Sequence, residues 1–88
     1  PTELEYRAKL VELCYSGDLG LLQKFLSEAD ESKTEDSHAA ASARIKLGLA
    51  DTNRESLPCV QKRALELFNE STREMKEKYG EKKAASND

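Results

Sequence analysis

The chain contains no tryptophan, and phenylalanine and tyrosine together make up only 6% of its 88 residues. Apolar residues of all kinds reach 38%, and no run of them is long enough to cross a membrane. A composition of this kind excludes a large hydrophobic core. We therefore expect one small, soluble domain, to which a partner protein or a second copy would add stability.

Cysteine and histidine, which are common metal ligands, are also scarce. Cys14 and Cys59 lie far apart and form no CxxC pair, and His38 is the sole histidine. Small secreted domains usually carry several disulfides, so two cysteines favour a reducing, cytoplasmic location and two buried thiols. We predict an exposed His38 beside Asp36, and neither a metal site nor a cofactor.

No catalytic or phosphate-binding motif is evident. No serine, threonine or cysteine has a recognisable base, and there is no glycine-rich loop. Asp51, Asn53 and Glu55 alternate as calcium-loop ligands do. However, Ser56 replaces the glycine of such a loop and Lys62 its final glutamate, so we interpret an ordinary turn. The sequence indicates a protein that is not an enzyme.

Basic residues are outnumbered, with 17 acids against 14 bases and a net charge of -3. Nonspecific binding to nucleic acid or to an anionic membrane requires a basic surplus, so we expect neither partner. Four of the seven residues from 30 to 36 are acidic, which predicts an exposed acidic loop. The remaining partners are another protein, a peptide or a second copy.

The longest helical signal spans residues 56–79. Its apolar residues recur three or four positions apart and therefore share one side of a helix. They are Leu57, Val60, Ala64, Leu67, Phe68, Met75 and Tyr79. Ser56 is the expected N-cap, Pro58 suits the first turn, and Gly80 is expected to end the helix. We expect the polar turns beyond Ser71 to project from the domain.

Three shorter helices are predicted before this segment, over residues 2–16, 19–29 and 37–50. The first carries one apolar stripe and a second group that widens it. The stripe comprises Leu4, Ala8, Val11 and Tyr15, and the widening group Tyr6, Leu10, Leu13 and Cys14. Gly17 is expected to end this helix and Asp18 to cap the next, so the two should form an antiparallel hairpin.

The second and third helices have simpler patterns. The second places Leu19, Leu22, Leu26 and Ala29 on one face, with Leu21 and Phe25 beside them. The third begins at a cap formed by Asp36 or Ser37. Its stripe contains Ala41, Ile45 and Leu49, with Ala43 and Leu47 alongside. Small residues in this helix allow a neighbouring helix to approach closely.

Residues Leu13, Gly17, Asp18 and Leu19 admit two interpretations. Their spacing resembles the short death-motif helix that docks into Bcl-family grooves, which would require one continuous helix. The same residues also form a helix stop followed by a helix start. The second interpretation is the more economical, because glycine and aspartate are common at these positions.

The second half of the chain resembles a Sel-like repeat, a helical hairpin related to the tetratricopeptide repeat. The resemblance rests on Ala43, Leu47, Gly48, Leu57, Pro58, Ala64, Phe68, Ser71 and Thr72. It implies that Gly48, Ala64 and Ser71 are the small sites where paired helices touch, with Leu47 and Phe68 filling the seam. The first half resembles a tetratricopeptide hairpin, and residues 16–26 also resemble the second half of an ankyrin repeat.

We therefore predict an all-α fold of four helices, arranged as two antiparallel hairpins in a repeat-like stack or a four-helix bundle. The helical domain should cover residues 1–80, followed by a polar, disordered tail over 81–88. The resemblance implies a protein-binding adaptor or scaffold, with Tyr6, Lys9, Arg44 and Lys46 as exposed contacts. The alternative is a small regulatory or inhibitory protein that acts by surface docking, through its acidic loop, or as a homodimer.

Overall fold

The structure, a computed structural model, describes the backbone of residues 2–30 and 36–86 and the side chains of residues 2–30 and 36–78. The described residues contain four helices and are otherwise turns and loops. The helices are α1 (Thr2–Tyr15), α2 (Gly20–Glu28), α3 (Ser37–Gly48) and α4 (Leu57–Ser86). The all-α prediction is confirmed, and all predicted helix ends except the last lie close to the observed ones.

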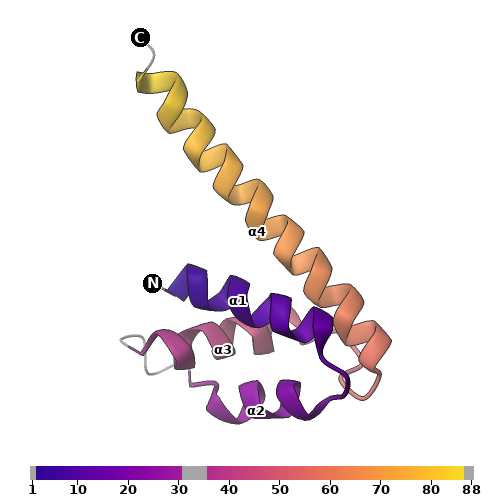
Figure 1. Cartoon of the computed structure of the whole chain (residues 1–88). Coiled ribbons are helices and arrows are strands. Elements are labelled where there is room, and N and C mark those ends of the chain that lie inside the picture. The colour runs from indigo at the N-terminus through magenta and orange to yellow at the C-terminus, as the bar shows by residue number, and fades with distance from the viewer. Residues whose placement is uncertain (1, 31–35, 87–88) are drawn as a thin grey trace.

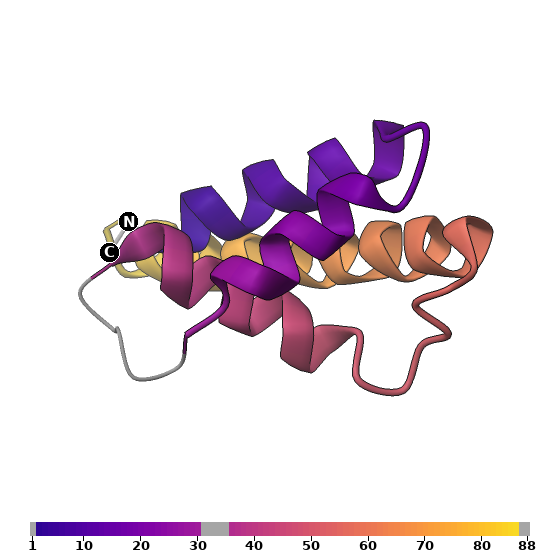
Figure 2. The same cartoon turned by 90° about the horizontal axis from the view of Figure 1, so that it is seen from below.

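Consecutive helices run in opposite directions, so α1 and α2 form one antiparallel hairpin and α3 and α4 form the other (Figures 1 and 2). The principal packing lies between these hairpins: α1 packs against both α3 and α4, and α2 packs against α3. Helix α1 is therefore the central element of the fold. The two predicted hairpins are present, and α1 joins them.

The core consists of apolar side chains from all four helices. Its fully or almost fully buried members are Tyr6, Leu10, Leu13, Leu22, Phe25, Ala41, Ile45, Leu49, Val60, Ala64 and Leu67. On α1 these are the residues of the widening group, whereas the stripe that begins at Leu4 is exposed. The broad apolar arc of α1 is therefore buried only in part, by the two neighbouring helices α3 and α4. Apolar residues occupy two faces of this helix, so periodicity alone does not determine which face meets α3 and α4.

Helix α3 has buried residues on several sides because α1 and α2 both pack against it. Its first half consists largely of alanine and serine, and a small side chain is the one that two close neighbours can accommodate. The predicted stripe of Ala41, Ile45 and Leu49 is buried, as is Ala43. Leu47, in contrast, is 65% exposed, so the prediction that it fills the seam with α4 is wrong.

The close approach of α3 and α4 occurs at Gly48. A Cβ atom at this position would lie 2.8 Å from Cδ1 of Leu67, closer than carbon atoms pack. Leu67 therefore packs against Gly48, at the contact between α3 and α4. Ala64 is fully buried, in agreement with a small contact site, while Ser71 lies against α1 rather than α3.

Side chains of α4 cap the carboxyl ends of two other helices. The Gln61 amide nitrogen Nε2 donates to the carbonyl oxygens of Leu13, Cys14 and Ser16 at 3.3, 3.2 and 2.8 Å. Nε of Arg63 donates to the carbonyl oxygen of Gly48 at 3.2 Å. Terminal carbonyls of a helix have no partner within the helix. These two residues of α4 therefore position the ends of α1 and α3.

A polar network joins α4 to the amino end of α1. The Ser71 hydroxyl donates to Oε1 of Glu3 at 2.7 Å and accepts from Nη1 of Arg7 at 2.8 Å. Arg7 also donates to Oγ1 of Thr72 at 3.0 Å, and Arg44 of α3 forms an ion pair with Glu3. Burial raises the pKa of Glu3, but the Ser71 hydrogen bond and the Arg44 charge outweigh it and bring the pKa below its usual value.

Helix α4 continues through Gly80 to Ser86, so the prediction that Gly80 ends it is wrong. An interior glycine costs a helix only about 1 kcal/mol relative to alanine, which favourable neighbours can offset. Figure 1 shows the carboxyl half of α4 extending away from the other helices, as expected for its polar turns. The structure thus describes residues 81–86 as helix where a polar tail was expected, and residues 87–88 lie outside the described chain.

In the part of the chain that the structure describes, no helix combines the length and the apolar character needed to cross a membrane. The predicted acidic loop falls mainly on residues 31–35, which lie outside the described residues. Its described ends are Asp30 and Asp36.

Replacing Gln61 should destabilise the fold through the carboxyl end of α1. We expect Gln61→Ala to lower the free energy of unfolding by about 1–2 kcal/mol, because the capped carbonyls lose their donor. Gln61→Glu should cost more, since a carboxylate cannot donate and would face the negative end of the helix dipole. Urea denaturation of both variants measures this effect. Lys62 is an exposed neighbour, and Lys62→Ala is the control. Equal stability of Gln61→Ala, Gln61→Glu and Lys62→Ala would contradict the capping role.

Protonation of Glu3 should weaken the fold in acid. Because the folded-state pKa lies below the unfolded value near 4.5, the stabilisation is complete above that value and is lost as the pH falls through the folded pKa. Glu3→Gln should therefore be less stable than the parent at pH 7 and should lose less stability between pH 5 and pH 3. Urea denaturation across this range tests the prediction, with the exposed Glu55→Gln as control. Parallel pH profiles for parent and Glu3→Gln would refute it.

Candidate protein-interaction site

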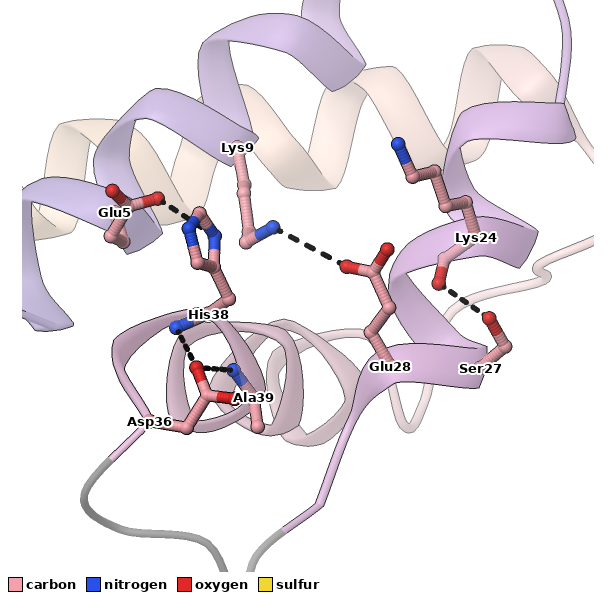
Figure 3. A network of polar contacts seen from close by, with 8 residues as sticks. All are labelled: Glu5, Lys9, Lys24, Ser27, Glu28, Asp36, His38 and Ala39. Carbon is pink, nitrogen blue, oxygen red and sulfur yellow. Dashed lines mark hydrogen bonds and ion pairs between the residues drawn. The ribbon is translucent and has the colours of Figure 1, made fainter.

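A cavity of about 690 Å³ lies between α1, α2 and the start of α3. Its lining contains both charged and apolar side chains. The charged and titratable residues are Glu5, Glu12, Glu28, Asp30, Asp36, Lys9, Lys24 and His38. The apolar residues are Ala8, Leu21, Phe25, Ala29 and Ala39. Because its lining contains five acids and only two lysines, we call it the acidic cavity. Figure 3 shows its polar contacts.

Lys9 lies deep in the acidic cavity, where it connects α1 to α2 (Figure 3). Its ammonium nitrogen is 4.2 Å from the centre of the Phe25 ring and 3.8 Å from Oε2 of Glu28. Only 6% of the residue is exposed, so the prediction that Lys9 is an exposed contact is wrong. A buried ammonium group requires partners, and the aromatic face and the carboxylate supply them.

The amino end of α3 forms the lower wall of the cavity. Asp36 caps α3, its Oδ1 accepting from the backbone nitrogens of His38 at 2.9 Å and Ala39 at 3.3 Å. This confirms the first of the two predicted caps. The His38 side chain is exposed, as predicted, and its Nδ1 lies 3.3 Å from Oε2 of Glu5 on α1. Together these contacts position the cavity wall.

The outer face of α1 carries an exposed apolar stripe, which we call the α1 stripe: Leu4, Ala8, Val11 and Tyr15. Leu4 is 59% exposed, Val11 40% and Tyr15 86%. A helix turns by about 100° per residue, which places this stripe about 180° from the buried face of α1. Ala8 belongs to both the α1 stripe and the acidic cavity, so the two features form one continuous surface.

The remaining predicted contact residues are distributed differently. Tyr6 is only 4% exposed, and the guanidinium carbon of Arg44 lies 3.9 Å from the centre of its ring. Burial raises the pKa of Tyr6. Tyr6 is therefore a core residue and not an exposed contact, Arg44 is partly exposed above it, and Lys46 is exposed. The structure does not bring these residues into one surface, and their partner-binding role stays a prediction.

The sequence shows the α1 stripe as apolar but does not separate it from the group that widens it and is buried. The charged residues beside each face do not separate the two faces in the sequence, because both faces are bordered by them. Glu3 and Arg7 border the inner face and meet Ser71 of α4, while Glu5, beside the outer face, lies next to His38 of α3. Which charged residues of α1 meet a partner depends on the tertiary arrangement. The sequence alone therefore cannot show which face of α1 is buried.

Among the described residues, neither cysteine joins a group of potential metal ligands. Cys14 is partly buried, and this burial raises the pKa of its thiol, while Cys59 is exposed. The expectation of two buried thiols is therefore wrong for Cys59, which follows Pro58 on the outer side of the first turn of α4. Within residues 2–30 and 36–78, no three potential ligands are grouped so that they could hold a metal ion.

The segment from Leu13 to Leu19 is a helix stop followed by a helix start. Helix α1 ends at Tyr15 and α2 begins at Gly20, whose backbone nitrogen donates to Oδ1 of Asp18 at 2.8 Å. The N-cap of α2 is Leu19 and not, as predicted, Asp18. A groove-binding death motif would require a continuous helix here. The structure therefore supports the second interpretation of these residues.

Lys9 should stabilise the fold more through packing than through charge. We expect Lys9→Ala to reduce the free energy of unfolding by about 1–3 kcal/mol, because it uncovers the Phe25 ring. Lys9→Met should remain within about 1 kcal/mol of the parent, since it keeps the length of the side chain and places sulfur near the ring. Urea denaturation distinguishes the two. Equal losses for both variants would show that the ammonium charge dominates.

A comparison of this chain with protein-family models, curated proteins and solved structures found no match. The resemblance to Sel-like and tetratricopeptide repeats is therefore a prediction from the residues themselves. The features of the described residues that bear on function are the acidic cavity and the α1 stripe.

Proposed function

We propose that this protein is a non-catalytic protein-interaction module that binds a helical segment of another protein along the α1 stripe. The observation that carries the proposal is the solvent exposure of Leu4, Val11 and Tyr15 on one helix face, opposite the core. Single exposed apolar residues are common, but a row of them along one helix is typical of a contact surface.

The helix-in-groove mode of recognition fits this surface. In that mode, residues spaced three or four apart on one helix contact a complementary apolar surface. The α1 stripe has this spacing, and the acidic cavity forms a hollow beside it. The repeat resemblance supports the same role, because helical-hairpin repeats act as scaffolds for other proteins. Two free cysteines favour action in a reducing, cytoplasmic compartment.

A homodimer is the second candidate, and the spacing of the α1 stripe favours it. In an antiparallel pairing of two copies of α1, Leu4 would face Tyr15 of the second copy and Ala8 would face Val11 of the second copy. Both pairs share one midpoint, so a two-fold axis could relate the helices. Light scattering across a dilution series, with helicity followed by circular dichroism, distinguishes this candidate from a monomer that binds another protein.

Substitution of the α1 stripe should abolish partner binding without unfolding the domain. We expect Val11→Ser/Tyr15→Ser to keep the helicity and unfolding midpoint of the parent, because both side chains are exposed. Proteins captured on the immobilised parent would be purified, and their affinity for each variant measured by calorimetry. At least a tenfold loss of affinity is expected for Val11→Ser/Tyr15→Ser.

The control removes exposed leucines elsewhere. Leu47 and Leu65 are both exposed and lie on α3 and α4. Leu47→Ser/Leu65→Ser should therefore bind the purified partner like the parent. A partner that binds all three proteins equally would contradict the proposed surface.

A further inference from the structure

We propose that the partner segment is a basic amphipathic helix, which lays its apolar side on the α1 stripe and its lysine or arginine side over the acidic cavity. This inference rests on the proposed function and deepens it by specifying the chemistry of the partner. Its grounds are the position of the acidic residues relative to the α1 stripe, the hollow beside them, and the poor fit of a second copy.

The acidic residues lie along one flank of the α1 stripe. Glu5 and Glu12 are two turns apart on α1 and both line the acidic cavity, on the side of the α1 stripe that faces α2. Glu28, Asp30 and Asp36 continue the acidic wall from α2 and the start of α3. An apolar row with acids on one flank is complementary to a helix with an apolar row and bases on one flank.

Most charged groups of the cavity already have partners within the protein: Glu5 lies beside His38, Glu28 pairs with Lys9, and Asp36 caps α3. Lys9 is buried between the Phe25 ring and Glu28, so it forms part of the floor. Lys24 is exposed at the α2 side, and His38 lies beside Glu5. Glu12, on the α1 side, is exposed where the cavity meets the α1 stripe. The five carboxylates of the lining nevertheless outnumber its two lysines, so the net charge of the cavity favours an arriving lysine or arginine.

A second copy fits the same surface less well. The antiparallel pairing that matches Leu4 with Tyr15 of the second copy also places Glu5 beside Glu12 of the second copy, twice. Like charges in such positions oppose association. The α1 stripe is about 16 Å long, while a stable dimer buries roughly 800 Å² on each partner. Each copy carries a net charge of -3, so electrostatic attraction between two copies does not strengthen that short contact.

The probes are three synthetic helical peptides of about 15 residues with one apolar row of leucines. One carries lysines along the flank of that row, one carries glutamines there, and one carries glutamates. Binding to the complete chain would be measured by fluorescence anisotropy at 50 mM salt and by amide chemical shifts. We expect the lysine peptide to bind at least tenfold more tightly than the glutamine peptide, and the glutamate peptide to bind most weakly.

Charge removal from the protein provides the matched test. Glu5→Gln/Glu12→Gln should weaken the lysine peptide about five- to tenfold and leave the glutamine peptide unchanged, as two partly screened ion pairs would. Glu74→Gln/Glu77→Gln, on the exposed part of α4, removes the same charge at a distance and should change neither affinity. Shifted amide signals should lie on α1 and around the cavity.

The possible failures are distinguishable. Equal binding of all three peptides at the α1 stripe would overturn the basic-partner inference and leave the proposed function standing. Equal weakening by the two charge-removing variants would also overturn it, because only net charge would then matter. If no peptide binds, or if Val11→Ser/Tyr15→Ser binds all of them like the parent, the proposed function itself fails. A dimer that pairs through the α1 stripe would replace the basic partner with a second copy.

Discussion

The alignment of α1 against α4 is the constraint on which the rest of the fold depends. At the amino end of α1, Glu3 and Arg7 meet the Ser71 hydroxyl, and at its carboxyl end Gln61 donates to the last carbonyls. Contacts at both ends determine the register and the rotation of α1 together. Because the rotation is determined, the outward residues of α1 are determined as well. The exposed α1 stripe is thus a consequence of polar contacts made on the opposite side of the helix.

Aromatic rings beneath cations recur at the edges of this small core. Lys9 lies over Phe25, Arg7 over Phe68 and Arg44 over Tyr6, with cation-to-centroid distances of 4.2, 4.2 and 3.9 Å. A domain of this size has too few large apolar residues to cover every ring. The long stems of lysine and arginine supply that cover while their charged groups reach carboxylates or hydroxyls. Residues that look like free surface charges in the sequence are therefore structural parts of the fold.

The candidate site was only partly predictable. Sequence patterns identified the Asp36 cap, the exposed His38 and the apolar character of Leu4 and Val11, because caps and periodicity depend on local chemistry. They did not identify the acidic cavity, whose residues come from three helices. They also misplaced Lys9, since its burial depends on Phe25 and Glu28 of another helix. Burial of a long basic side chain has no signal within its own segment.

The sequence by itself determined the four helices, most of their ends and the alternation of their directions, because caps, glycines and short connections act over a few residues. Tertiary structure alone decided which face of α1 is buried, that Leu67 packs against Gly48 while Leu47 is exposed, and where Gln61 and Arg63 donate. Those outcomes depend on contacts between residues far apart in the chain. Two apolar faces on one helix are equivalent until neighbouring helices bury one of them, and the other then remains exposed.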